Sequence, residues 1–94
     1  MITITRKRGD TRRLRFHTTF ALGDVAITAS ARDAGGTARA IPAGVVDLDA
    51  RLFELWGIDT LPVGRHACEV EYNRLGARVP TQTFFLQITE AMTP

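Results

Sequence analysis

The segment from His66 to Tyr72 alternates in polarity at every residue, and this pattern constrains the fold more than any other part of the chain. One face of the segment carries the histidine and the more apolar residues: His66, Cys68, Val70 and Tyr72. The other face carries Ala67, Glu69, Glu71 and Asn73. A period of two with one charged face is typical of a half-buried β-strand. We therefore expect the rest of the chain to pack against a strand at this position.

Short strands are predicted along the whole chain by the same alternation. The other predicted strands are Ile2–Thr5, Arg13–Phe20, Val25–Arg32, Thr37–Ile41, Arg51–Trp56 and Thr81–Thr89. Turn signals separate them at Arg8–Thr11, Leu22–Asp24, Asp33–Gly36, Ala43-Gly44 and Asn73–Gly76, with Gly76 expected at positive φ. About seven short strands with a turn roughly every 8–12 residues are typical of a β-sandwich. We predict an all-β, immunoglobulin-like sandwich of about seven antiparallel strands, a single domain over residues 1–94 with a tail at 90–94.

Residues 45–56 fit two patterns. Four residues could lie on one face of a helix: Leu48, Leu52, Leu55 and Trp56. Alternation over Arg51–Trp56 fits a strand instead, and Gly44 and Gly57 bracket the segment. We favour the strand because every neighbouring segment is predicted to be one. Between residues 58 and 63 we expect one turn of 3₁₀ helix capped by Asp59 or Thr60.

The predicted core contains the inward residues of both sheets. Its members are Leu14, Phe16, Phe20, Val25, Ile27, Leu52, Trp56, Cys68, Val70, Tyr72, Phe84, Leu86 and Ile88. The remaining large aromatic residues that could be exposed for stacking are Phe53 and Phe85, with Trp56 as a further candidate.

The composition excludes several classes of protein. With 45% apolar and 23% charged residues, the chain is too balanced for disorder, and no apolar run approaches the roughly 20 residues of a membrane helix. The basic start is not followed by an apolar signal-peptide core, so we expect synthesis and folding in the cytoplasm. Cys68 is the only cysteine, which leaves no internal disulfide and no cysteine-based zinc site.

The formal net charge of +2 is distributed unevenly. Residues 1–15 carry six basic side chains against Asp10 alone, which gives +5, and the remainder carries −3. The basic residues of this region are Arg6, Lys7, Arg8, Arg12, Arg13 and Arg15. Such a patch could meet nucleic acid or an acidic protein, or could be solvated side chains on a hairpin and its turn.

Catalytic patterns find no support in the sequence. His66 and Cys68 would lie about 6–7 Å apart along a strand, too far for a nucleophile–base hydrogen bond, and a buried free cysteine is common in cores. We interpret His66 as a residue at the boundary of the core. Two histidines are too few for a histidine metal site, and Gly35-Gly36 lacks the lysine and helix of a phosphate loop. We expect no enzyme activity, cofactor or metal. Arg8-Gly9-Asp10 spells an adhesion tripeptide, but glycine and aspartate are also what a turn needs.

A family resemblance adds to this interpretation. The residues on which the resemblance rests are Arg8–Thr11, Gly23–Val25, Asp59–Gly64, the strand His66–Tyr72, Gly76, Thr81 and the closing Leu86–Thr89. In this order they resemble the small β-sandwich domains of tailed bacteriophages and prophages, most closely the amino-terminal domain of baseplate upper proteins and related tail components. His66 stands where that pattern usually has a tyrosine. The resemblance implies a non-enzymatic structural component of the tail or baseplate, which assembles with copies of itself and with other virion proteins.

Two further function classes stay open. One is a nucleic-acid-binding module that uses the Arg6–Arg15 patch, although no aromatic residue on the same strand face interleaves with it. The other is a sugar-binding or adhesion sandwich with exposed aromatic residues. For the structural hypothesis, the predicted contact surface combines the six basic residues with Glu69, Glu71 and Phe85, the arginines pairing with a neighbour's glutamates. Phe85 is either such a contact or is covered by residues 90–94.

Overall fold

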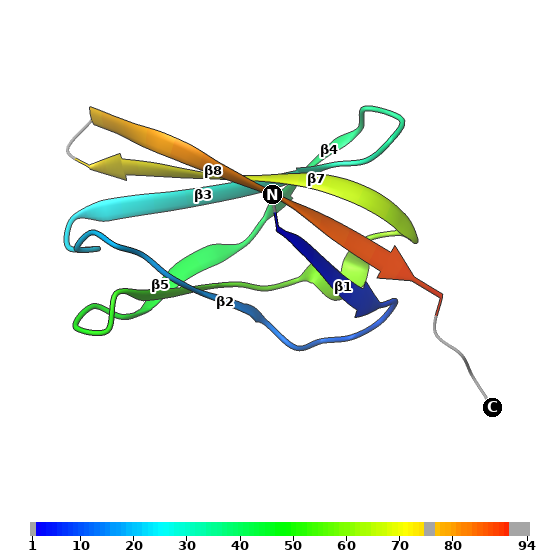
Figure 1. Cartoon of the computed structure of the whole chain (residues 1–94), viewed down its shortest axis with the longest axis horizontal. Coiled ribbons are helices and arrows are strands. Elements are labelled where there is room, and N and C mark those ends of the chain that lie inside the picture. The colour runs from blue at the N-terminus through cyan, green and yellow to red at the C-terminus, as the bar shows by residue number, and fades with distance from the viewer. Residues whose placement is uncertain (1, 75–76, 91–94) are drawn as a thin grey trace.

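The computed structural model describes residues 2–74 and 77–90, with the backbone alone for residues 77–80. Within these ranges the chain forms two β-sheets that lie over one another as layers (Figure 1). The larger sheet has the order β1-β8-β7-β3-β4, with strands Thr3–Lys7, Ala77–Thr89, Gly64–Arg74, Val25–Arg32 and Ala38–Ile41. The smaller sheet has the order β2-β6-β5, with strands Leu14–His17, Leu52–Leu55 and Ala43–Asp47. The prediction of an all-β, sandwich-like fold is confirmed.

The expectation that every strand is antiparallel is wrong for β1. This strand pairs in parallel with β8, from Thr3 opposite Phe85 to Lys7 opposite Thr89, and the larger sheet is therefore mixed. Parallel neighbours need a long crossover rather than a hairpin. Here the crossover is almost the entire chain, because the segment after β1 leaves the larger sheet at once to form β2.

The expected seven strands become eight among the described residues, because the region around Pro42 holds two strands. Pro42 ends β4 as predicted, but Ala43-Gly44 opens β5 instead of turning the chain. Proline has no N–H for a sheet ladder, and its carbonyl accepts the N–H of Trp56 at 3.1 Å. The chain passes from the larger to the smaller sheet at this residue.

The strand favoured for residues 51–56 is confirmed over Leu52–Leu55. It pairs with β2 on one side and β5 on the other, with a register shift between Val45 and Asp47. The turn before it is closed by the Asp47 carboxylate, whose Oδ1 accepts the N–H of Ala50 at 3.1 Å. A helix over this segment is thus excluded.

Several element boundaries differ from the prediction. β1 covers Thr3–Lys7 rather than Ile2–Thr5, β7 begins earlier at Gly64, and β8 begins at Ala77 rather than Thr81. The predicted loop at residues 73–76 starts later because Arg74 still pairs with Ala77, while Leu75 and Gly76 lie outside the described residues. The 3₁₀ turn is confirmed at Ile58–Thr60, but Gly57 with φ 77° occupies its N-cap and no side chain caps it.

Most predicted core residues are buried between the sheets. The buried cluster contains Leu14, Leu22, Ala29, Ala31, Ile41, Phe53, Leu55, Ile58, Leu61, Cys68, Val70, Tyr72, Phe84, Leu86 and Ile88. Phe53 of the smaller sheet meets Tyr72 of the larger one edge-on, with ring centroids 5.8 Å apart. Phe16, Phe20, Val25 and Ile27 pack against the cluster and stay half-buried.

Three of the sequence predictions about single residues are wrong. Phe53, a candidate for exposure, is fully buried, because it faces the larger sheet between Phe16 and Tyr72. Trp56, a predicted core residue, is half-buried on the outer side of the smaller sheet. His66, placed at the boundary, is 1% exposed. It can be buried because the Pro62 carbonyl lies within hydrogen-bond distance of its ring.

Candidate interaction surfaces

The outer face of the smaller sheet is closed by an ion-pair cluster. Arg15 lies opposite Glu54 in the β2–β6 register, and its guanidinium donates to Glu54 Oε2 from Nε at 3.0 Å and from Nη2 at 2.8 Å. Arg13 donates to Glu54 Oε1 at 3.3 Å. Two arginines on one carboxylate leave a net charge of +1. We call the surface formed by Arg13, Arg15, Glu54 and Trp56 the closed face.

Trp56 completes the closed face. The Arg13 guanidinium lies over its ring, with the carbon 5.2 Å from the centroid, within the range of a cation–π contact. The ring also covers Gly44, where a Cβ atom would come within 3.2 Å of Trp56 Cη2. Glycine at this position therefore lets the indole lie flat against β5. The sequence did not place this aromatic residue beside the arginines, since the two lie on different segments of the chain.

The electrostatics of the closed face follow from these contacts. Hydrogen bonds from Arg15, and next from Arg13, lower the pKa of the Glu54 carboxyl below its usual value, against the opposing effect of desolvation. The carboxylate is thus charged at neutral pH and is satisfied within its own chain.

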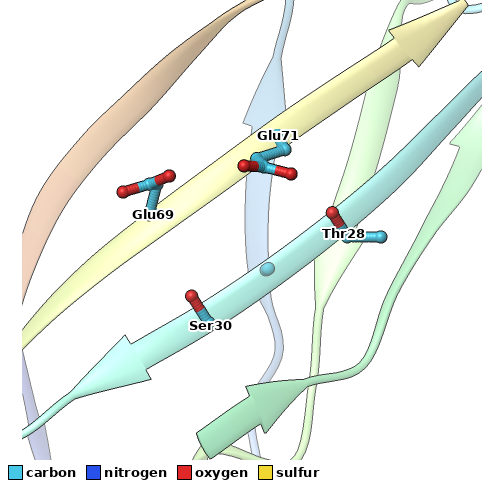
Figure 2. A pocket seen from close by; sticks show the side chains of 5 residues that line it. Thr28, Ser30, Glu69 and Glu71 are labelled. Carbon is cyan, nitrogen blue, oxygen red and sulfur yellow. The ribbon is translucent and has the colours of Figure 1, made fainter. Parts of the chain in front are cut away.

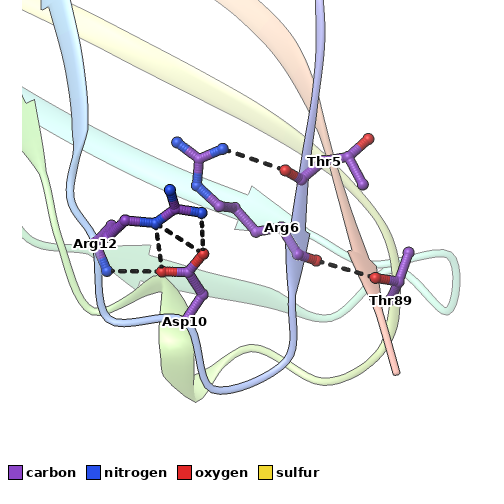
Figure 3. Close-up of polar contacts among 5 residues, drawn as sticks. All are labelled: Thr5, Arg6, Asp10, Arg12 and Thr89. Atoms are coloured by element: carbon purple, nitrogen blue, oxygen red, sulfur yellow. Dashed lines mark hydrogen bonds and ion pairs between the residues drawn. The ribbon is translucent and has the colours of Figure 1, made fainter. Parts of the chain in front are cut away.

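The predicted basic patch does not form one surface. Arg12 folds back on Asp10 with a bidentate contact, Nη2 to Oδ2 at 2.6 Å, and this holds the pKa of Asp10 at about 2 (Figure 3). Arg6 lies nearby on β1 and donates from Nη1 to the Thr5 carbonyl at 3.2 Å. Together with Arg13 and Arg15 on the closed face, four of the six basic residues have partners in the chain.

The two remaining basic residues, Lys7 and Arg8, are exposed where β1 ends. They lie at the edge of the larger sheet, whereas Arg13 and Arg15 lie on the smaller one. The excess charge of residues 1–15 is therefore divided between two sheets, because the chain crosses from one layer to the other after β1.

The outer face of the larger sheet is different in character. Glu69 and Glu71 project from β7 beside the hydroxyls of Thr28 and Ser30 on β3, around a hollow of about 200 Å³ (Figure 2). Glu69 is exposed and has no ion-pair or hydrogen-bond partner among the described side chains. The two glutamates predicted for the contact surface thus lie together on one face.

Two further hollows continue along this face. One of about 230 Å³ shares Ser30 and Glu69 with the first and extends over Ala67 and Thr83. The next, of about 180 Å³, shares Ala67 and is lined by Arg65 and Phe85. Small side chains at the centre of the sheet produce this continuous depression. We call the surface lined by Ser30, Arg32, Arg65, Ala67, Glu69, Glu71, Thr83 and Phe85 the open face.

Phe85 is half-buried on the open face, as its position opposite Phe84 and Leu86 predicted. The guanidinium of Arg65 lies over its ring at 3.9 Å from the centroid. This contact from the neighbouring strand covers part of the ring. Of the residues predicted to cover it, 90–94, all but Glu90 lie outside the described residues. Arg65 was not among the predicted site residues, because the predicted strand began at His66, whereas β7 begins at Gly64.

The free edge of β5 and the turn that follows it expose a short apolar run. Val45 is 37% exposed, Val46 49% and Leu48 57%. The register shift at Val46 interrupts the regular ladder, and bulges of this kind are a common means of protecting a sheet edge from pairing.

His66 and Cys68 are both buried in the core. His66 Nε2 lies 2.8 Å from the Pro62 carbonyl oxygen and donates to it, because a carbonyl can only accept. Cys68 is 1% exposed, and burial raises the pKa of its thiol to about 11. The prediction that Cys68 is a core residue is confirmed, and such a thiol is a poor nucleophile at neutral pH.

Across the described residues, no group of three or more His, Cys, Asp or Glu side chains is arranged to hold a metal ion, and no helix is long and apolar enough to cross a membrane. No protein-family model matches the chain, and no curated protein matches it.

Proposed function

We propose that this chain is a non-enzymatic structural component of a phage or prophage particle, of its tail or baseplate, that acts through protein–protein contacts. The observation that carries the proposal is the open face, where exposed charge and a half-buried aromatic ring border a continuous depression. A surface of this kind is suited to a second protein, because it offers complementary charge together with apolar contact. The resemblance of the turn and strand segments to tail β-sandwich domains supports the same assignment.

We further propose that the strand order is immunoglobulin-like. The order β2-β6-β5 corresponds to strands B-E-D of such a sandwich, and β8-β7-β3-β4 corresponds to G-F-C-C′ of the variable type. The first strand lies beside the last instead of beside B. Amide-to-amide contacts measured by nuclear magnetic resonance would test this, since β1 and β8 must be parallel neighbours and β1 and β2 must not pair.

In this proposal the partners are copies of the chain and other virion proteins, and the chain is made in the bacterial cytoplasm before assembly into the particle. The test is to induce and purify particles from a bacterium that encodes the chain and to search them by mass spectrometry. We expect the chain at a fixed ratio to the tail proteins, and we expect it to remain with tails separated from heads. A chain absent from purified particles would refute the proposal.

Nucleic-acid binding is the second candidate, and the stacking of Arg13 on Trp56 is the observation that favours it. Basic and aromatic side chains on one face can bind single strands. Glu54, however, neutralises part of that charge from the centre of the same face. Titration with single-stranded and duplex DNA decides between the two. Micromolar binding at physiological salt with a steep salt dependence would favour this function over the structural one.

A further inference from the structure

We propose that the open face is a self-complementary interface, through which two copies of this chain pack face to face about a two-fold axis. The inference rests on the proposed function and specifies its first partner as a second copy of the chain. It follows from how charge and side-chain size are arranged along β7.

Charge changes sign along the open face. On β7, Arg65 lies near one end and Glu71 near the other, with Cys68 midway between them in the sequence. At a rise of about 3.3 Å per residue, the two charges are roughly 20 Å apart. On the neighbouring strand, Arg32 pairs with Ala67, and Ser30 pairs with Glu69. Arg65 and Arg32 therefore lie toward one end of the face, and Glu69 and Glu71 lie toward the other.

A two-fold axis relates these halves to one another. The axis lies between the two faces, parallel to the sheets and perpendicular to the strands, at the level of Cys68 on β7. Rotation about this axis reverses the strand direction in the second copy. Arg65 of each copy then faces Glu71 of the other. Residues that lie side by side on neighbouring strands form a row across the sheet, and the row that contains Arg32 faces the row that contains Glu69. Two equivalent sets of opposite charges result, as an isologous interface requires.

Side-chain size follows the same symmetry. The row that contains the bulky Arg32 and Phe85 is laid against the row that contains Ser30 and Thr83. The large side chains of one copy thus meet the depression of the other. The small residues at the centre let the two sheets approach closely, as they must in a sheet-on-sheet contact about 10 Å thick.

The described charges beside the basic half leave its sign unchanged. Asp33 lies near the basic half, but it accepts from the Thr37 N–H and contacts Arg39 at 3.3 Å. Arg32 donates to the Gly36 carbonyl at 2.8 Å, which orients the guanidinium without neutralising it. Five strands about 4.8 Å apart give a face roughly 24 Å wide. A face of this width limits the buried surface area to the small end of specific interfaces, so we expect a micromolar dissociation constant.

The test is sedimentation equilibrium of the full chain between about 5 and about 500 μM. We expect a monomer–dimer equilibrium that weakens severalfold when salt rises from about 0.05 to about 0.5 M, because the charges lie near solvent. Each of the changes Arg32→Glu and Glu69→Arg should weaken the dimer about tenfold or more. Asp59→Arg is the matched control for Glu69→Arg, since it makes the same change of charge on the exposed 3₁₀ turn and should leave the dimer unchanged.

An equimolar mixture of the Arg32→Glu and Glu69→Arg proteins sharpens the test. In the mixed dimer, the glutamate introduced in one copy meets the arginine introduced in the other, so opposite charges face each other again. The second contact of the mixed dimer is native, and the affinity should therefore return to that of the unchanged protein. Circular dichroism of each variant establishes that it is folded.

A monomer at all concentrations, or a mixture that does not recover, would overturn the inference. So would a dimer insensitive to these changes but abolished by Val46→Lys, because pairing would then run through the β5 edge. These outcomes are independent of whether the chain is found in particles, so failure of the interface and failure of the proposed function can be told apart.

Discussion

The central strands of the two sheets bury their residues in different ways. In β6, all four residues from Leu52 to Leu55 are buried, whereas β7 alternates between buried and exposed positions. The difference arises outside the core: Arg13, Arg15 and Trp56 cover the outer side of β6, while the outer side of β7 is left open. A charged residue on a sheet surface can therefore help to close that surface where its partner lies on the next strand, as Glu54 does, or can stay exposed, as Glu69 does.

Removing an aromatic ring should destabilise the protein far more at Phe53, between the sheets, than at Phe85, on the open face. Phe53→Ala removes a fully buried ring between the sheets and should lower the free energy of unfolding by about 3–5 kcal/mol. Phe85→Ala removes a half-buried ring from the open face and should cost less than about 1.5 kcal/mol. Urea unfolding of both variants measures the difference, and similar losses would mean that the open face is as much a part of the core as β6.

The same substitution at two glutamates separates the faces by charge. Glu54→Gln removes the carboxylate that holds Arg13 and Arg15, and should lower the urea midpoint while leaving the slope unchanged. Glu69→Gln changes an exposed carboxylate without a described partner, and at concentrations where the chain is monomeric its midpoint should stay where it was. A loss at Glu69 equal to that at Glu54 would contradict the distinction between a closed and an open face.

Acid should remove the stabilising contribution that Glu54 makes to the closed face. The pKa of Glu54 is lowered in the folded state by its hydrogen bonds with Arg15 and Arg13. The contribution of Glu54 to the free energy of unfolding is therefore fully present above the unfolded pKa near 4.5, and it is lost as pH falls through the lower folded pKa. The contribution of Asp10 is lost in the same way as pH falls from its unfolded pKa of about 3.8 to its folded pKa of about 2. We expect stability to decline below about pH 5. Glu54→Gln should flatten this decline in urea midpoints measured against pH, and a curve as steep as that of the unchanged protein would refute the assignment.

The smallest expected effect concerns the contact of Trp56 with β5. In Gly44→Ala, the added methyl group lies 3.2 Å from the indole and should push it outward, which shifts the tryptophan fluorescence to longer wavelength. Gly23→Ala is the control, because nothing lies within 4 Å of its Cβ position. The control should keep its spectrum and gain up to about 1 kcal/mol from the stiffer unfolded chain. Identical spectra for the two variants would show that the ring does not cover Gly44.

Local structure and most of the core could be predicted from the order of residues along the chain. Alternation identified β3, β7 and β8, and turn residues located the chain reversals at Gly9, Asp24 and Gly36, where φ is positive. These features are set by a period of two and by backbone sterics, which neighbouring residues encode. Alternation also placed Cys68 in the core and Phe85, Glu69 and Glu71 outside it, because a strand position decides which face a side chain takes.

The identity of neighbouring strands, and with it the nature of each surface, follows from the packing of the two sheets and could not be predicted from local patterns. The parallel pairing of β1, the two strands around Pro42 and the burial of Glu54 all depend on contacts between segments that are distant in the sequence. The sequence showed six basic residues in one run, but it could not show that Glu54 pairs with two of them and Asp10 with a third. Charge and shape on a β-sheet surface are set by residues side by side on different strands, and their pairing is fixed by the packing of the whole core.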